Sequence, residues 1–156
     1  MKRATLLLLS LLSLPAMADG DRMPAQENAA WKEECGSCHV AYPPSLLSAA
    51  NWRQMMGSLD RHFGANTQLD AKPRDEILAF LEANAASKET RHSAASLRIS
   101  DTPWFGRKHD EVPIALWKDA RLKSPANCGA CHQDAERGTY RERNIVMPGG
   151  MRKADK

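Results

Sequence analysis

Hydrophobic positions in the first half of the chain recur with the period of amphipathic helices. Between residues 45 and 64, the periodic set is Trp52, Met55, Met56, Leu59 and Phe63. Ser45 is placed to cap this predicted helix and Gly64 to end it. His62 falls on the same apolar stripe, so we expect its side chain on the buried face near the end of the helix.

Two further helices are predicted in this half. Residues 27–39 read as a helix with Trp31 one turn before Cys35. Residues 70–86 read as a helix capped by Asp70, with one apolar face formed by Ile77, Leu78, Leu81 and Ala85.

The second half holds a short predicted helix. Pro103 suits its first turn, and either Asp101 or Thr102 can cap it. No alternation typical of strands is found near the cysteines. The predicted fold class is therefore all-α, a small helical protein.

The first residues have the features of an export signal. Lys2 and Arg3 precede an apolar run over residues 4–15, and residues 16–18 form a small-residue cleavage site. That run is shorter than the roughly 20 residues of a membrane-spanning helix, so an uncleaved anchor is the weaker alternative. We expect cleavage after Ala18 and a periplasmic mature chain that is not stably inserted in a membrane.

The net charge of the chain bears on whether it binds nucleic acid. The sequence has 22 Lys and Arg against 19 Asp and Glu, a formal net charge of +3. Nucleic-acid-binding proteins usually carry a strong basic excess, so no nucleic-acid partner is predicted. The basic residues of the C-terminal tail are read as an irregular, solvated end.

All cysteines lie in two copies of one motif, Cys-x-x-Cys-His. The copies are Cys35, Cys38 and His39, and Cys128, Cys131 and His132. Two thiols three positions apart on a turn of helix can add to the two vinyl groups of one haem, and the next histidine is then carried to the iron. Two copies behind an export signal, with no cysteine left over, predict two covalently bound haem c groups.

Other uses of the cysteines fit this spacing less well. Zinc ribbons separate their two Cys-x-x-Cys pairs by about 15–20 residues, whereas 89 residues separate Cys38 from Cys128. A disulfide within Cys-x-x-Cys closes a very small loop and gains little stability, and bridges between the motifs leave the histidines unexplained. A thioredoxin-like pair needs a βαβ setting, for which there is no pattern.

Each haem iron also needs a ligand opposite the motif histidine. His62 is a candidate because it lies on the inner face of its predicted helix, and His109 because it follows two aromatic residues, Trp104 and Phe105. Spacing alone does not decide which haem each of these histidines serves.

The remaining histidine and the methionines are weaker candidates. His92 lies in a polar stretch and is read as a solvated linker residue. Met147 precedes a proline after the second motif and is the main alternative, while Met55 and Met56 are read as core residues. The choice matters because Met/His ligation raises the potential of the iron compared with two histidines.

The order of elements divides the chain into segments. After the leader at 1–18, residues 19–86 form an N-terminal haem domain that resembles a shortened monohaem cytochrome c. Residues 87–100 are polar and read as a linker. Residues 101–156 form a C-terminal haem segment that ends in the irregular basic tail.

Four stretches together resemble the dihaem cytochrome c family of bacteria, the DHC type: WKEECGSCHVAYPPSLL, MGSLDRHFGAN, RISDTPWFGRKHDEVP and SPANCGACHQDAERG. The resemblance implies a small periplasmic electron carrier in which two histidines bind each iron, His39 with His62 and His132 with His109. It also implies exchange with other redox proteins, such as a membrane b-type cytochrome or a soluble c-type cytochrome. The tail after Arg141 departs from the family pattern.

Two irons that each hold two protein ligands have no free position for a substrate. We therefore expect the protein to pass single electrons between redox partners and not to be an enzyme. The alternative is a haem enzyme or gas-binding protein in which one axial ligand is labile, with peroxidase-like or oxygen-binding chemistry.

Overall fold

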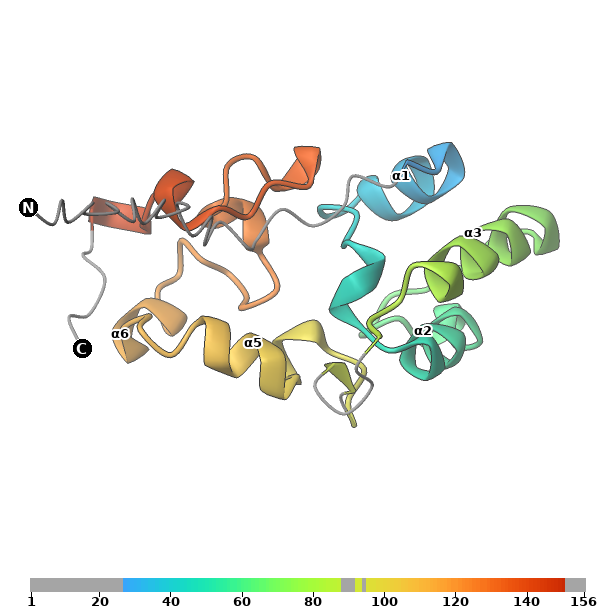
Figure 1. The fold of residues 1–156 in the computed structure, drawn as a ribbon, viewed down its shortest axis with the longest axis horizontal. Helices are drawn as coiled ribbons and strands as arrows, with labels where there is room; N and C mark the ends of the chain where they lie inside the picture. Colours follow the sequence, from blue (N-terminus) through green and yellow to red (C-terminus); the bar gives the residue numbers. More distant parts are fainter. Residues whose placement is uncertain (1–26, 88–91, 94, 151–156) are drawn as a thin grey trace, which may run out of the picture.

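The computed structural model describes residues 27–87, 92–93 and 95–150, which are mostly helical (Figure 1). The α-helices are α1 (Ala29–Gly36), α2 (Ala49–Met56), α3 (Ala71–Ala83), α5 (Pro103–Lys108) and α6 (Ile114–Trp117). Short 3-10 turns occur at Pro44–Leu46, Leu59–Arg61, Ile99–Asp101, Cys128–Ala130, Ala135–Arg137, Glu142–Asn144 and Pro148–Gly150. The described residues form no β-strand, as the all-α prediction requires.

Membrane crossing is not a feature of the described helices. None of them combines the length and the apolar character that a bilayer span requires. The predicted leader at residues 1–18 lies outside the described residues.

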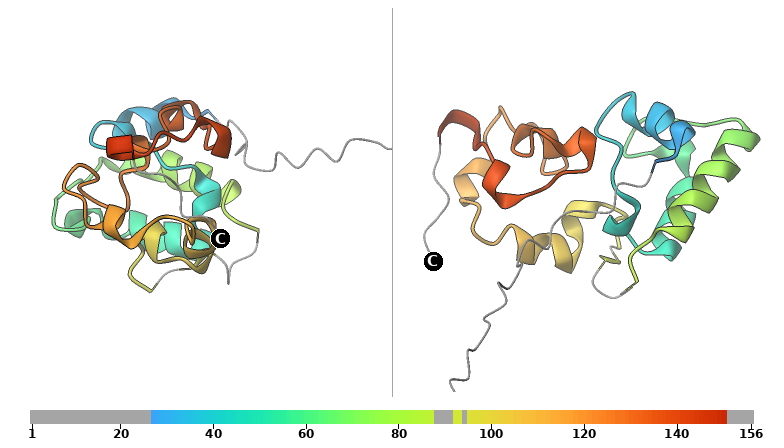
Figure 2. Two further views of the ribbon diagram at one scale, coloured as in Figure 1. Left: turned by 90° about the vertical axis from the view of Figure 1, so that its left-hand side faces the viewer. Right: turned by 45° about the horizontal axis from the view of Figure 1, so that its top comes forward.

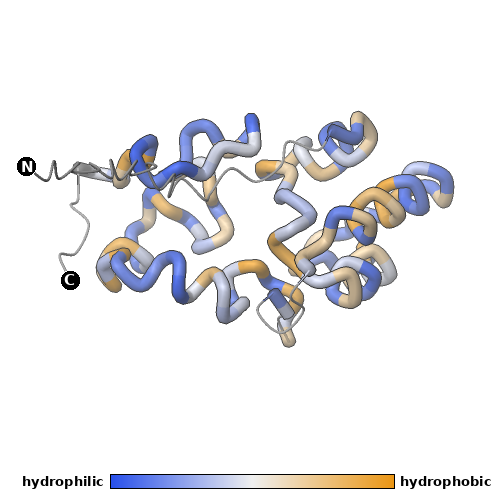
Figure 3. The backbone as a smooth tube through the Cα atoms, viewed as in Figure 1, coloured by the Kyte–Doolittle hydropathy of each residue, from blue (hydrophilic) through white to orange (hydrophobic). Residues whose placement is uncertain are grey.

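The helices form two groups that lie side by side (Figures 1 and 2). The first group contains α1, α2 and α3, and its core consists of Trp31, Leu47, Trp52, Met55, Met56, Ile77 and Leu81. Hydrophobic and hydrophilic stretches alternate along α2 and α3 (Figure 3), as expected of helices that bury one face. The second group contains α5, α6 and the C-terminal turns, and it buries fewer apolar side chains: Phe105, Leu116, Leu122 and Ala135.

Helix α1 lies within the predicted stretch 27–39 but is shorter at both ends, and it leads into the first cysteine motif. The side chain of Asn28 caps the helix by accepting a hydrogen bond from the Trp31 amide at 2.7 Å. The helix ends at Gly36, so Cys35 lies in its last turn. The rest of the motif forms a tight turn outside the helix.

Helices α3 and α5 also begin at predicted caps. α3 follows Asp70, although the carboxylate of Asp70 makes no capping hydrogen bond. α5 follows Thr102, whose hydroxyl accepts a hydrogen bond from the Phe105 amide at 3.1 Å. Of the two capping candidates, Thr102 is therefore the cap, and Asp101 belongs to the preceding 3-10 turn.

The helix predicted over residues 45–64 is shorter at both ends than the apolar pattern suggested. Ser45 was the wrong cap, because it lies in a separate 3-10 turn and Ser48 caps α2. The helix ends at Met56 and not at Gly64. Phe63, which the pattern placed on the buried stripe, is 45% exposed.

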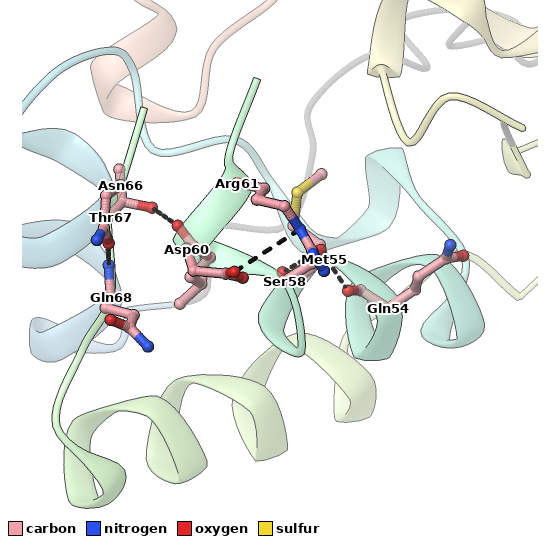
Figure 4. Close-up of polar contacts among 9 residues, drawn as sticks. Gln54, Met55, Ser58, Asp60, Arg61, Asn66, Thr67 and Gln68 are labelled. Atoms are coloured by element: carbon pink, nitrogen blue, oxygen red, sulfur yellow. Dashed lines mark hydrogen bonds and ion pairs between the residues drawn. The ribbon is translucent and has the colours of Figure 1, made fainter. Parts of the chain in front are cut away.

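Side-chain hydrogen bonds explain why α2 stops early (Figure 4). The hydroxyl of Ser58 donates to the carbonyls of Gln54 at 2.9 Å and Met55 at 3.3 Å, which satisfies acceptors at the end of the helix. Thr67 then closes the following loop, because its amide and hydroxyl both donate to the Leu59 carbonyl. Apolar periodicity continues past Met55, but the backbone turns away from the helix.

We expect Ser48→Ala to lower the free energy of unfolding by about 2 kcal/mol, because the buried hydroxyl of Ser48 bonds both the amide and the side chain of Asn51. The matched control is Asp70→Ala, where only the favourable charge near a helix N-terminus is lost, about 0.5 kcal/mol. Urea unfolding of both variants checks this. Equal losses would contradict the assignment of Ser48 as a cap.

The segment before α5 packs on the first helical group. Leu97 and Ile99 contact its hydrophobic core. His92 is half-buried, its ring is stacked on Trp104 with centroids 5.3 Å apart, and its Nδ1 lies 3.4 Å from the Leu46 carbonyl oxygen. The prediction of a solvated His92 was therefore wrong, because tertiary packing covers a locally polar stretch.

Candidate functional site

The first cysteine motif borders a cavity of about 520 Å³ that is lined mainly by the group of α1, α2 and α3. Cys35, Cys38 and His39 line it from the end of α1 and the turn that follows. His62 lines the same cavity from the loop after α2. Most of the remaining lining is apolar and includes Trp52.

The second motif borders a cavity of about 260 Å³ in the other helical group. Cys128, Cys131 and His132 line it, and the His132 amide donates to the Cys128 carbonyl at 2.8 Å. His109 reaches the cavity from the end of α5. Met147 also lies in the lining.

Two histidine rings in each cavity have the separation of two imidazoles on opposite sides of one metal ion. Ring centroids are 6.2 Å apart for His39 and His62, and also 6.2 Å apart for His109 and His132. A metal–imidazole bond is about 2.0–2.1 Å long and the ring centre lies about 1.1 Å beyond the bonded nitrogen, which gives a centroid separation of about 6.2–6.4 Å. The structure thus brings together the pairs that the family resemblance implies, and they do not cross over.

Backbone carbonyls orient one histidine of each pair. Nδ1 of His39 lies 2.8 Å from the Val40 carbonyl oxygen, and Nδ1 of His109 lies 2.9 Å from that of Phe105. An Nδ1 that donates to a carbonyl carries the ring proton, so the lone pair for a metal is on Nε2.

His62 and His109, the histidines that face the motif histidines, are held in the neutral form. Burial lowers the pKa of His62, and the nearby imidazole of His39 lowers it further. Burial also lowers the pKa of His109, although the hydrogen bond to Phe105 opposes it. Neutral imidazole is the form that binds metals, so both residues suit ligation at neutral pH.

The cysteines are available for covalent chemistry. None of the four forms a disulfide. Burial raises the pKa of Cys35 and Cys128 to about 11 and also raises that of Cys131, so these groups are thiols at neutral pH. Among the described residues, no three His, Cys, Asp or Glu side chains converge as a zinc site requires.

The donor set and the unmet polar atoms fit haem. Each cavity combines two thiols, two imidazoles and an apolar lining, which suits a flat apolar ring held at one edge and ligated on both faces. The buried Oη of Tyr140 and the buried Nδ1 of His62 have no hydrogen-bond partner in the protein. Carboxylate side arms such as those of haem would supply an acceptor for such groups.

Three aromatic residues of the sites were missed in the sequence. Tyr42 stacks on His39 with centroids 4.5 Å apart, and Tyr140 lies 5.3 Å from His132. Trp117 lines the second cavity. Tyr42 could have been predicted as a site residue, because it follows the motif by three positions. Tyr140 and Trp117 could not, because only tertiary packing places them at the second site.

The two cavities share a wall. The Tyr42 hydroxyl donates to the Ala126 carbonyl at 2.6 Å, which joins segments 84 positions apart. Ala126 lines the first cavity, whereas its neighbours Pro125 and Asn127 line the second. Ile99 lines both. The two sites are therefore adjacent parts of one packed unit.

A family model described as dihaem cytochrome c matches residues 31–140, which contain both motifs and both histidine pairs. The chain belongs to the dihaem cytochrome c family. Its cofactors are therefore two haem c groups, each with one iron. Membership of this family indicates a haem protein that transfers electrons.

Solved structures of other dihaem cytochromes are similar to this one. DHC from Rhodobacter sphaeroides is 41% identical, with 74% of this chain and 99% of that chain covered and a TM-score of 0.65. The diheme cytochrome type c of Shewanella baltica is 36% identical, with 78% and 94% covered and a TM-score of 0.69. No protein with a curated description matches the chain.

Proposed function

We propose that this dihaem cytochrome is an exported, periplasmic carrier of single electrons in which two histidines bind each iron. His39 and His62 are assigned to the first iron, and His132 and His109 to the second. The observation that carries the proposal is the 6.2 Å separation within each pair, beside its own Cys-x-x-Cys motif. Met147 ranks below His109, although it lines the same cavity, because the histidine pair already has the separation of two axial ligands.

Covalent attachment is assigned to Cys35 and Cys38 at the first site and to Cys128 and Cys131 at the second. Each thiol adds across one vinyl double bond, so that sulfur bonds one carbon and the thiol hydrogen goes to the other. The resulting thioethers keep the cofactor in two small helical groups, of which the N-terminal one resembles a shortened monohaem cytochrome c.

The haems supply one-electron chemistry between ferric and ferrous iron. The chain's part is to give each iron two imidazole ligands whose orientation the packing fixes, as the hydrogen bonds of His39 and His109 illustrate. Two histidines on each iron would leave no coordination site open to a substrate, so we propose a carrier and not an enzyme.

The partners we propose are other redox proteins, such as a membrane b-type cytochrome or a soluble c-type cytochrome. Export follows from the leader at residues 1–18, which the family match at 31–140 does not include. The modest formal charge of +3 supports neither nucleic-acid binding nor strong attraction to an anionic lipid surface.

We expect carbon monoxide to leave the visible spectrum of the reduced protein unchanged, because both irons hold two strong protein ligands. The measurement is a difference spectrum of the dithionite-reduced protein with and without the gas. Rapid binding at either haem would refute two-histidine ligation there and favour the alternative with a labile ligand.

A further inference from the structure

The two histidine pairs differ in how their rings are turned. The ring planes of His39 and His62 meet at 26°, whereas those of His109 and His132 meet at 85°. Centroid separations are equal, so the pairs differ in ring orientation and not in spacing. One pair is close to parallel and the other close to perpendicular.

Neighbouring groups hold one ring of each pair. The ring of His39 lies within 15° of parallel to Tyr42, while its Nδ1 is bonded to the Val40 carbonyl. The ring of His109 lies within 19° of parallel to Phe105 at 3.9 Å, and its Nδ1 is bonded to the carbonyl of the same residue. Rotation of either imidazole would break both a ring stack and a hydrogen bond.

Ring orientation changes the electronic state of a ferric iron with two imidazole ligands. The π orbital of each imidazole raises the energy of the iron d orbital that it overlaps. Parallel rings raise the same d orbital and separate it in energy from the second d orbital of π symmetry. Ferric iron has one electron fewer than ferrous iron, and the raised orbital is the one left half-filled, which stabilises the ferric state. Perpendicular rings raise both orbitals alike, so this stabilisation is lost and the reduction potential is higher.

We propose that the ring orientations make the two irons unequal, with the higher reduction potential at the C-terminal iron between His109 and His132. The inference rests on the proposed function, namely two-histidine ligation of both irons. A single electron from an external one-electron reductant then resides on the C-terminal iron, which changes from ferric to ferrous while no bond is made or broken. Tyr42 and Phe105 are positioning residues for this difference.

Exposure of the two sites does not decide the order of the potentials. At the first site Cys38 is exposed and Phe63 is 45% exposed, whereas Cys128 and Cys131 at the second site are both half-buried. Ferric haem carries one more positive charge than ferrous haem, and burial disfavours the more charged state. The first cavity, however, is lined by more buried apolar side chains, among them Trp52, Met55 and Leu81, so burial does not single out the C-terminal iron.

The charged residues around the second cavity act against the proposed order, but weakly. Its lining includes two cations and three anions: Arg107, Lys108, Asp110, Glu111 and Glu142. An excess of anions favours ferric iron. Four of these five side chains are exposed, so solvent and salt screen them, and we expect ring orientation to decide the order.

Low-temperature electron paramagnetic resonance of the fully oxidised protein tests the orientation. We expect two low-spin ferric signals of equal intensity, a rhombic signal from the near-parallel pair and a signal with a large maximum g value from the near-perpendicular pair. Two low-spin signals of the same type would overturn the inference while leaving two-histidine ligation intact. A high-spin signal would instead count against the ligation, so the two failures are distinguishable.

A reductive titration followed by the same method tests the order of the potentials. We expect the signal with the large maximum g value to disappear first as electrons are added. Earlier loss of the rhombic signal, or simultaneous loss of both, would overturn the proposed order.

Variants of the positioning residues assign each signal to its iron. Tyr42→Leu removes the ring stacked on His39 and should shift or broaden only the rhombic signal, whereas Tyr42→Phe keeps the ring and should preserve it. Phe105→Leu should move only the other signal. The unaffected iron in each variant reports that the protein is folded. A rhombic signal that moves in Phe105→Leu and not in Tyr42→Leu would reverse the assignment and overturn the proposal.

Discussion

Replacing His109 with alanine is expected to open the C-terminal iron. The variant loses the imidazole whose ring centroid lies 6.2 Å from that of His132, and alanine has no group that can bind a metal. One of the two haems should then become high-spin when ferric, and it should bind carbon monoxide when ferrous. Visible difference spectra and electron paramagnetic resonance of the purified variant measure both effects.

The matched control for this variant is His92→Ala. His92 is half-buried and stacks on Trp104, but it is not among the described residues that line either cavity. We expect both irons of this variant to stay low-spin and inert to carbon monoxide. If His109→Ala behaves in this way and His92→Ala opens an iron, the assignment of His109 is wrong. If neither opens an iron, Met147 becomes the candidate ligand, since it lines the second cavity.

Removing all four thiols is expected to leave the chain largely unfolded. Each helical group is small, and a domain of about 60 residues buries only about 60% of the surface that its unfolded chain exposes. Both cavities lie inside these groups, so without bound haem their apolar linings face water. Far-ultraviolet circular dichroism of the quadruple Cys→Ala variant should show little helix, and a native-like spectrum would contradict the prediction.

The two groups should differ in how strongly they depend on haem. The first group has a core of seven buried residues, whereas the second relies on Phe105, Leu116, Leu122 and Ala135. We therefore expect Cys128→Ala/Cys131→Ala to unfold the C-terminal group while α1, α2 and α3 keep their helical content, which far-ultraviolet circular dichroism measures. The reciprocal Cys35→Ala/Cys38→Ala variant is the control, and it should retain more helix than the first double variant.

The fold follows from the sequence where apolar period and caps agree. Thr102 and the apolar face of α3 are examples, because capping and burial are local properties of the chain. The end of α2 could not be predicted, since apolar positions continue past the hydroxyl of Ser58 that terminates the helix. His92 was misjudged because Trp104 covers it from another segment.

Much of the site was visible in the sequence because its chemistry is encoded in short motifs. The motif histidines and cysteines needed only spacing, and the candidates His62 and His109 needed one further step. The angle between two rings is different, since it depends on stacking partners such as Tyr42 and Phe105 that only packing brings into contact. The residues of the two sites could therefore be predicted from the sequence, whereas the proposed difference in reduction potential between the two irons could not.

The hydrogen bond from Tyr42 to the Ala126 carbonyl means that this protein is not two interchangeable modules. A fragment that ends in the 87–100 segment keeps the donor but loses the carbonyl, and with it part of the wall of its own cavity. A single-residue deletion in the loop at 125–127 would displace the second motif and damage the first site as well. We therefore expect truncation of either half to change the cavity of the other half. The smallest part of the chain that can hold either cavity complete therefore includes residues from both halves.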